Sequence, residues 1–234
     1  MRVCRIFAGT MPARARSRKP TVYPIILAAG PSGQLPFPKA LAPFEGKTAL
    51  ERAVETCRGT PDLGRPIIVL GCDMRRVLAA WRKGGGTRAR SATIVRNPNW
   101  RKGQLTSLLT GLGQAPHGAS AFLLYPVDYP LLTPRIIARL LRAFHTRKKR
   151  QGIVFPAIGS RSGHPIVVSR ALVAEFRACA RRGGTARDVI YRETHADRML
   201  RVPVRDAAIF RDFDSPASYR LCLRLLRRRA APRS

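Results

Sequence analysis

Short apolar runs alternate along the chain with segments of helical period, and this alternation is the first guide to the fold. Runs rich in β-branched and apolar residues predict strands at residues 22–28, 66–70, 92–95, 121–127, 153–155 and 165–168. Apolar positions three or four residues apart predict helices at residues 49–57, 74–81, 105–112, 136–144, 171–180 and 186–191. Strands that alternate with helices are typical of an α/β domain with a mostly parallel sheet.

The C-terminal part of this pattern is less regular. A short strand pair is expected around Arg201 to Phe210. A last helix should begin after Ser215, a natural N-cap, with Pro216 at the first helical position. We therefore predict one domain over residues 21–226, between a basic, flexible N-terminal tail (1–20) and a basic C-terminal tail (227–234).

Composition supports a folded domain and adds a strong positive charge. Of the 234 residues, 45% are hydrophobic, enough for a buried core and unlike a disordered basic segment. Lys and Arg number 44 against 13 Asp and Glu, a net charge of +31 that attracts phosphates, nucleic acid and anionic membrane surfaces alike. The first twenty residues carry six basic and no acidic side chains. Solvated tails explain this excess best, and non-specific binding of polyanions is the alternative.

The cysteines and the hydropathy pattern bear on location. The five cysteines are far apart and show no C-x-x-C spacing, which favours neither a zinc site nor a disulfide framework. No apolar stretch approaches the roughly 20 residues of a membrane span, and residues 1–20 lack the apolar core of a secretory signal. We expect a reducing, cytoplasmic setting. Residues 1–20 would also suit a transit peptide or a start codon placed too early.

The loop after the first strand is a candidate phosphate-binding loop. Residues 27–33 read L-A-A-G-P-S-G, and such small residues let backbone N–H groups approach an anion. The spacing matches neither the P-loop nor G-x-G-x-x-G, so an ordinary strand-to-helix turn is an equal alternative. Lys39, directly after Pro38, places a cation where the loop ends.

Carboxylates occur at two informative places. Asp128 follows the apolar strand 121–127, at the edge of an α/β sheet where ligands bind, and is a candidate ligand for Mg²⁺. Its alternative role is to form a turn before Tyr129. Asp212 and Asp214 precede the last helix and either complete a metal site or favour the helix N-terminus electrostatically. Their positions alone favour the second role.

Two further segments offer polar groups. His164 lies between Gly163 and Pro165, a restricted backbone that would aim the ring into a cleft, although a lone histidine is more often structural. Residues 97–107 contain Asn97, Gly103, Thr106 and Ser107 at the entrance to a predicted helix, where hydroxyl groups would bind a base or a phosphate. A plain turn is the alternative.

Taken in order, these motifs resemble those of the MobA-like nucleotidyltransferases, and most closely the molybdenum cofactor cytidylyltransferases. The family pattern L-A-A-G-x-S-x-R-x-G-x-P-K is similar to residues 27–39, and its N-P-x-(aromatic)-x-x-G-x-x-(S/T)-S stretch to residues 97–107. The D-x-P, G-H-P and D-x-D-(S/T)-P motifs match residues 128–130, 163–165 and 212–216. Together the five motifs cover nearly the whole domain.

The resemblance implies a fold and a reaction. The fold would be a Rossmann-like three-layer α/β/α domain with a mostly parallel sheet. A nucleoside monophosphate, CMP from CTP, would pass to a phosphate of a molybdopterin-type acceptor with release of pyrophosphate. Mg²⁺ would be the cofactor, and a molybdoenzyme or its maturation factor would receive the product.

The resemblance also assigns roles to residues of this chain. Lys39 and Asp128 would be catalytic, Asp128 and Asp214 would hold Mg²⁺, and His164 would contact the acceptor. The nucleotide would be bound by Leu27, Ala28, Ala29, Gly30, Ser32, Lys39, Asn97, Gly103 and Ser107.

One departure from the family keeps alternatives open. Gln34 and Pro36 stand where the family has Arg and Gly, so the loop lacks a guanidinium for the triphosphate. A sugar phosphate or another small molecule would be the acceptor under one alternative. Under another, the chain is a non-catalytic, basic relative that binds nucleic acid or a phospholipid surface.

Overall fold

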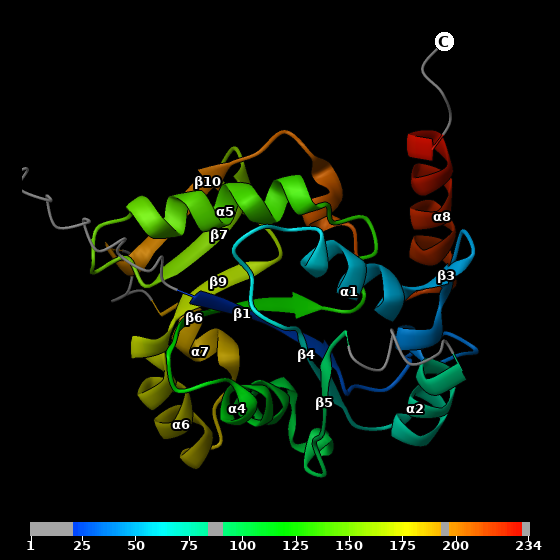
Figure 1. Cartoon of the computed structure of the whole chain (residues 1–234), viewed down its shortest axis with the longest axis horizontal. Coiled ribbons are helices and arrows are strands. Elements are labelled where there is room, and N and C mark those ends of the chain that lie inside the picture. The colour runs from blue at the N-terminus through cyan, green and yellow to red at the C-terminus, as the bar shows by residue number, and fades with distance from the viewer. Residues whose placement is uncertain (1–20, 84–90, 193–196, 231–234) are drawn as a thin grey trace, which may run out of the picture.

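The computed structural model describes residues 21–83, 91–192 and 197–230, and places an eight-stranded sheet between two layers of helices (Figure 1). The strand order is β10-β7-β9-β6-β1-β4-β5, with β8 paired to β7. The strands are β1 (Thr21–Ala28), β4 (Ile67–Leu70), β5 (Thr93–Arg96), β6 (Ala119–Pro126), β7 (Ile153–Ile158), β8 (Arg161–Ser162), β9 (Ile166–Ser169) and β10 (Met199–Pro203). The expected three-layer α/β fold is confirmed.

The direction of the strands decides where a ligand can bind. β1 pairs in parallel with both β4 and β6, so that Ile25 lies beside Ile67 and Leu124. β9 runs antiparallel to β6 and β7, and β10 is parallel to β7. The carboxyl ends of β1, β4, β6, β7 and β10 therefore lie at one edge, which is the usual ligand edge of an α/β sheet.

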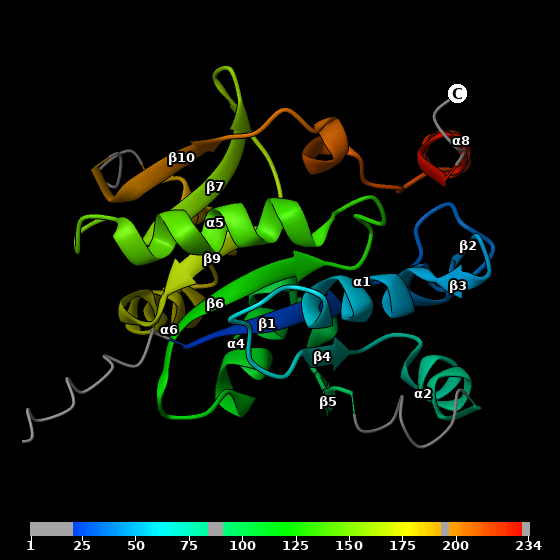
Figure 2. The same cartoon turned by 45° about the horizontal axis from the view of Figure 1, so that its top comes forward.

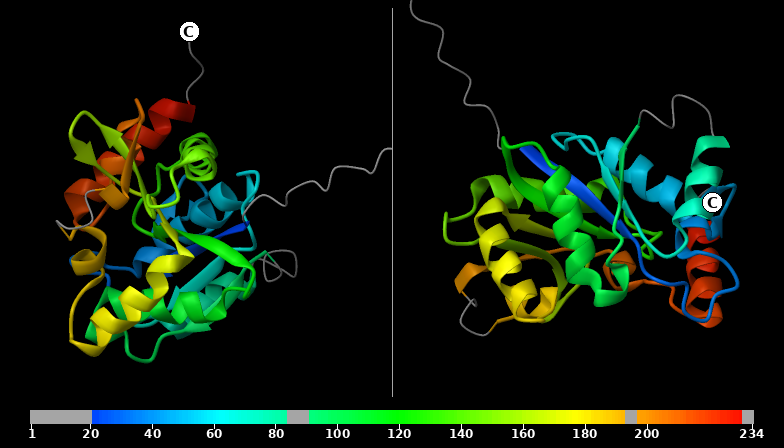
Figure 3. Two further views of the ribbon diagram at one scale, coloured as in Figure 1. Left: turned by 90° about the vertical axis from the view of Figure 1, so that its left-hand side faces the viewer. Right: turned by 90° about the horizontal axis from the view of Figure 1, so that it is seen from below.

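The two faces of the sheet have separate cores. Consecutive residues of β1 point to opposite faces: Ile26 packs into the core with α1 and α5, and Ile25 into the core with α4. Figure 2 shows α1 and α5 over one face, and the right panel of Figure 3 shows α4 and α6 across the other. The helices of the first layer are α1 (Ala49–Arg58), α2 (Met74–Lys83), α5 (Pro134–Thr146) and α8 (Pro216–Ala230); those of the second are α4 (Gln104–Gln114), α6 (Val173–Arg181) and α7 (Ala186–Ile190).

Local sequence explains where two of these helices, α1 and α8, begin. Thr48 ends the small hairpin of β2 (Pro43–Phe44) and β3 (Lys47–Thr48) and caps α1, where its hydroxyl accepts from the Glu51 N–H and Glu51 accepts from the Thr48 N–H in return. The predicted cap of α8 is confirmed, because the Ser218 N–H donates to Ser215 Oγ at 3.2 Å. Such caps satisfy N–H groups that have no partner within the helix.

The structure corrects two expectations near the C-terminus. Only β10 forms in the region of the expected strand pair, and Ala207–Phe210 is a 3-10 helix, η5, because the Asp206 carboxylate accepts from the Ala208 N–H and caps it. Helix α8 extends to Ala230, so residues 227–230, expected in a tail, are helical, and Arg227 pairs there with Glu45. The expected N-terminal tail (1–20) lies outside the described residues.

Among the helices of the described segments, none combines the length and the apolar character that a membrane span requires.

Candidate functional site

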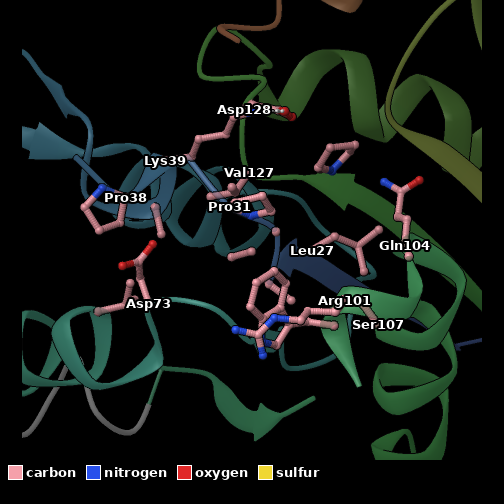
Figure 4. Close-up of a pocket in the computed structure, with 18 residues that line it drawn as sticks. Leu27, Pro31, Pro38, Lys39, Asp73, Arg101, Gln104, Ser107, Val127 and Asp128 are labelled. Atoms are coloured by element: carbon pink, nitrogen blue, oxygen red, sulfur yellow. Dashed lines mark hydrogen bonds and ion pairs between the residues drawn. The ribbon is translucent and has the colours of Figure 1, made fainter. Parts of the chain in front are cut away.

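A pocket of about 580 Å³ opens at the carboxyl edge of the sheet, where β1 and β6 end (Figure 4). Segments far apart in the sequence meet here because parallel strands deliver their following loops to the same edge. Most of the residues that the sequence nominates line this pocket: Leu27, Ala28, Ala29, Gly30, Lys39, Gly103, Ser107 and Asp128.

Lys39 lies between two carboxylates at one end of the pocket. Its ammonium donates to Asp128 Oδ2 at 3.1 Å and to Asp214 Oδ1. Lys39 begins the 3-10 helix η1 (Lys39–Leu41), Asp128 follows β6, and Asp214 precedes α8. Only 19% of the Lys39 side chain and 20% of Asp128 are exposed, against 62% of Asp214. Three separate segments thus build one charged cluster.

Burial and neighbouring charges both shift the pKa values of the groups in this cluster. Burial of the Lys39 ammonium by itself would lower its pKa, but the hydrogen bonds and charges of Asp214 and Asp128 outweigh it and raise the pKa. Burial raises the pKa of Asp128 despite the adjacent ammonium. Burial, and then the charge of Asp214, also raises the pKa of Asp212. The ionised form of these two carboxyl groups is therefore disfavoured, and a bound cation would stabilise it.

The same cluster suits a hard divalent cation. Asp128 Oδ1 is buried and has no hydrogen-bond partner among the described residues. The described segments contain no group of three or more His, Cys, Asp or Glu side chains arranged for a metal. Mg²⁺ and similar ions commonly take only one or two carboxylates, and water and substrate phosphates supply the remaining ligands. Asp128 and Asp214 fit that mode.

The opposite end of the pocket carries an aromatic ring and a second cation. Trp100 and Arg101 come from the 3-10 helix η2 (Trp100–Lys102), and the Arg101 guanidinium lies 4.5 Å from the centre of the Trp100 ring. A Cβ at Gly71 would come within 2.8 Å of Trp100 Cβ, so glycine is needed for the ring to pack there. In Figure 4, Arg101 lies across the pocket from Lys39 and Asp128.

Sequence reasoning missed Arg101 and Asp73 as members of this pocket. Asp73 follows β4 by three residues. The rule that led to Asp128, a polar residue just past a buried strand, would have found Asp73 as well. Arg101 carries no such signal, because the chain contains 44 basic residues.

Asn97 lies behind the pocket wall. It is buried, and its amide donates to Thr106 Oγ1 and Ser107 Oγ, both at 2.9 Å, while its Oδ1 accepts from the Asn99 N–H. These bonds hold the turn at the start of α4, where Gly103 has a φ of 100° that favours glycine. We expect Asn97 to act by fixing Ser107, which lines the pocket.

The loop position that departs from the family is turned outward. Gln34 is exposed and Ser32 is half-buried, and neither lines the pocket. Because Arg101 lies at the far end of the pocket, it does not stand in for a loop guanidinium. Of the two basic residues that line the described pocket, Lys39 is therefore the one at the carboxylate end.

His164 lies beside the carboxylate cluster, outside the pocket wall. Its ring centre is 4.9 Å from that of Tyr129, and the backbone N–H of His164 donates to the Ile209 carbonyl at 3.0 Å. Nδ1 is buried and has no partner among the described residues. Burial lowers the pKa of His164 to about 4, so the ring is neutral at neutral pH.

This lowered pKa predicts a stability change in acid. The unfolded chain binds a proton at His164 near pH 6.5 and the folded chain only near pH 4, so the histidine makes the fold less stable as pH falls through that window. Between pH 7 and pH 5, the free energy of unfolding of His164→Gln should fall by about 2 kcal/mol less than that of the unmodified protein. Urea unfolding at both pH values measures this. The exposed His117, changed to Gln, is the control, and equal losses in all three proteins would contradict the prediction.

Comparisons with known proteins bear on the family and the fold. The family model described as MobA-like NTP transferase domain matches residues 24–198. Over 158 residues the chain is 32% identical to nicotine blue oxidoreductase of Paenarthrobacter nicotinovorans, covering 65% of this chain and 73% of that protein.

Solved structures give the same fold. A nucleotidyl transferase from a species of Methanothermobacter superposes with a TM-score of 0.72 at 19% identity, covering 89% of this chain and 99% of that one. A Mycobacterium tuberculosis protein in complex with manganese gives 0.66 at 22% identity, covering 87% and 98%. At these identities the likeness shows the fold alone.

Proposed function

Because the chain belongs to the MobA-like NTP transferase family, we propose that it moves a nucleoside monophosphate from a nucleoside triphosphate to a phosphate-bearing acceptor. CTP is the proposed donor and a molybdopterin-type compound the proposed acceptor, with pyrophosphate as the other product. A divalent cation, Mg²⁺ or Mn²⁺, is the proposed cofactor, which is supported by the manganese in the related mycobacterial structure.

The observation that carries this proposal is the Lys39 ammonium between Asp128 and Asp214 at the end of a pocket built from residues 27–30. A triphosphate brings negative charge that needs a fixed cation and a metal site close together. In the described pocket wall, Lys39 is the fixed cation. Asp128, with Asp214 nearby, is the candidate metal site. When bound there, the cation would neutralise phosphate charge and polarise the P–O bonds.

The protein's own part in the reaction is positioning and charge stabilisation. Residues 27–30 would hold the nucleoside, and Lys39 would contact the α-phosphate as charge develops on it. An oxygen of the acceptor phosphate attacks the α-phosphorus in line; the new P–O bond forms as the bond to the β-phosphate oxygen breaks, and pyrophosphate leaves with that electron pair. The attacking oxygen is already anionic, so no side chain has to remove a proton.

The pocket does not favour a role in binding polyanions. Although basic residues outnumber acidic ones by 44 to 13 in the chain, the pocket wall holds two of each: Lys39 and Arg101, Asp73 and Asp128. A surface built for polyanions gains nothing from buried carboxylates. The basic excess therefore lies elsewhere than in this pocket.

The relative named nicotine blue oxidoreductase favours a second candidate, a redox reaction with a dinucleotide in the same pocket. Lys39 would then bind a pyrophosphate bridge, but paired carboxylates at that end would have no evident task. A sugar phosphate in place of a pterin is a narrower alternative, which changes only the acceptor.

Nucleotide binding separates these possibilities. Calorimetric titration of CTP, GTP, ATP and NADPH, each with and without Mg²⁺ and at moderate and high salt, supports the proposal if one triphosphate binds in a metal-dependent, salt-tolerant way. Tighter, metal-independent binding of NADPH supports the redox candidate. Equal binding of all four that fades with salt would leave only general anion attraction. Product analysis with pterin and sugar phosphates then identifies the acceptor.

Arg101 gives a prediction for the nucleoside end. Held against Trp100, its guanidinium can donate to base carbonyl oxygens at little entropic cost. We expect Arg101→Gln to weaken nucleotide binding by at least about tenfold, the lower end of what one charge-assisted hydrogen bond contributes. Lys102→Gln, the neighbouring cation outside the pocket wall, is the matched control. Equal affinities for both variants would remove Arg101 from the site.

A further inference from the structure

The carbonyl groups of the loop from Asp128 to Leu132 are hydrogen-bonded by residues that do not belong to the loop. Each of its five consecutive carbonyl groups accepts a hydrogen bond from a residue outside the loop. The donors are the Phe213 N–H for Asp128, the Tyr125 hydroxyl for Tyr129, Arg52 Nε for Pro130, Arg229 Nη1 for Leu131 and Thr56 Oγ1 for Leu132. Because buried carbonyl groups need partners, these donors decide the path of the loop that presents Asp128.

Arg229 differs from the other side-chain donors because it also holds the second segment of the site. Its Nη1 donates to the Leu131 carbonyl at 2.8 Å, and its Nη2 donates to Asp206 Oδ1 at 2.5 Å. Asp206 in turn caps η5 through the Ala208 N–H. One planar guanidinium therefore joins the loop after Asp128 to the start of the segment 206–214.

Segment 206–214 is also bonded to the site and its surroundings at three further residues, Ile209, Phe213 and Asp214. The Ile209 carbonyl accepts from the His164 N–H at 3.0 Å, the Phe213 N–H donates to the Asp128 carbonyl at 3.1 Å, and the segment ends at Asp214 beside Lys39. In Figure 1, α8 stands at the right-hand end of the molecule, beside β3 and close to the end of α1. The last turns of this helix thus reach back to the segments that carry both carboxylates.

We propose that Arg229, near the end of α8, is a positioning residue that fixes Asp128 and Asp214 relative to each other by bridging the Leu131 carbonyl and Asp206. Arg229 is not among the residues that line the pocket, and it acts through the two segments. This inference rests on the proposed function, because the spacing of the carboxylates matters for turnover only if they take part in transfer. Arg229, which lies in the predicted C-terminal tail (227–234), thus helps to hold the site in place.

The test compares Arg229→Met with Arg228→Met, its neighbour on the same helix, which is exposed as Arg229 is. Methionine keeps an unbranched apolar chain and removes the guanidinium. Because small displacements of reacting groups are costly, we expect Arg229→Met to lower kcat about tenfold while KM for the nucleotide changes less than about threefold. Arg228→Met should match the unmodified protein in both. Loss in KM alone, or equal loss in both variants, would overturn the proposal.

Hydrogen exchange gives a readout that is independent of turnover. The Phe213 and His164 N–H groups should exchange faster in Arg229→Met and stay unchanged in Arg228→Met. Asp206→Asn keeps the cap of η5 but removes the charge, and should add little to Arg229→Met because the two changes break one interaction. If the unmodified protein transfers no nucleotide, the proposed function fails while exchange still reports on the bridge. Identical exchange in all variants overturns the bridge even where transfer is established.

Discussion

Replacement of Asp128 by Asn should reduce nucleotidyl transfer by at least about 100-fold, the scale on which one electrostatic group of an active site acts. Asn keeps the volume and one oxygen but removes the charge. Asp128 Oδ2 accepts from Lys39, and Oδ1 is buried without a partner among the described residues, so the change removes a charge that few neighbours could replace. Metal-dependent binding of the triphosphate should be lost together with turnover.

Two measurements and one control make this result decisive. Steady-state release of pyrophosphate gives the rate, and calorimetry with and without Mg²⁺ gives the metal-dependent part of nucleotide binding. Glu175→Gln removes a carboxylate of α6 that pairs with Arg198, away from the pocket wall, and should change neither. Full metal-dependent binding in Asp128→Asn would show that the carboxylate is not a metal ligand and that the assignment is wrong.

Replacement of Lys39 by Met should produce two opposite effects. Turnover should fall about 100-fold because the cation that would stabilise the α-phosphate in the transition state is gone. Affinity for Mn²⁺ in the absence of nucleotide should rise, because the ammonium that now neutralises Asp128 and Asp214 no longer competes with a metal for their oxygens. A role in folding alone would not raise metal affinity.

The control for this prediction is Lys47→Met. Lys47 also pairs with a carboxylate, Glu55, but 48% of its side chain is exposed and it lies outside the pocket wall. Exposed pairs contribute little, so neither turnover nor metal affinity should change. Mn²⁺ titration followed by electron paramagnetic resonance measures the affinity directly. Unchanged Mn²⁺ binding in Lys39→Met would mean that the carboxylates are not the metal site.

The order of the elements in the sequence was enough to place the site at one edge of the sheet. The apolar run before Asp128 marks a buried strand, and the small residues after Leu27 mark a loop at the end of another. Since parallel strands end at a common edge, both loops had to meet there. Lys39 and Asp128 could therefore be expected in one pocket before any contact between them was known.

Residues whose role depends on a neighbour could not be identified in this way. Asn97 was expected to touch the nucleotide, yet its hydrogen bonds to Thr106 and Ser107 place it behind the wall. A strand pair was expected around Arg201 to Phe210, but its last residues form a 3-10 helix that Asp206 caps. In both cases a single side chain redirects the local structure, and hydropathy patterns contain no record of such bonds.

The sequence by itself determined the α/β fold with a mostly parallel sheet, the edge at which the candidate site lies and the residue types at that edge, because strand and helix periodicity depend on local patterns of apolar residues. Only the tertiary structure decided that Asp214, 175 residues beyond Lys39, shares its ammonium with Asp128, that Arg101 lines the pocket and that Arg229 bridges two loops. These pairings arise where separate segments pack together, and an arginine that makes such a bridge looks the same in the sequence as one that is solvated.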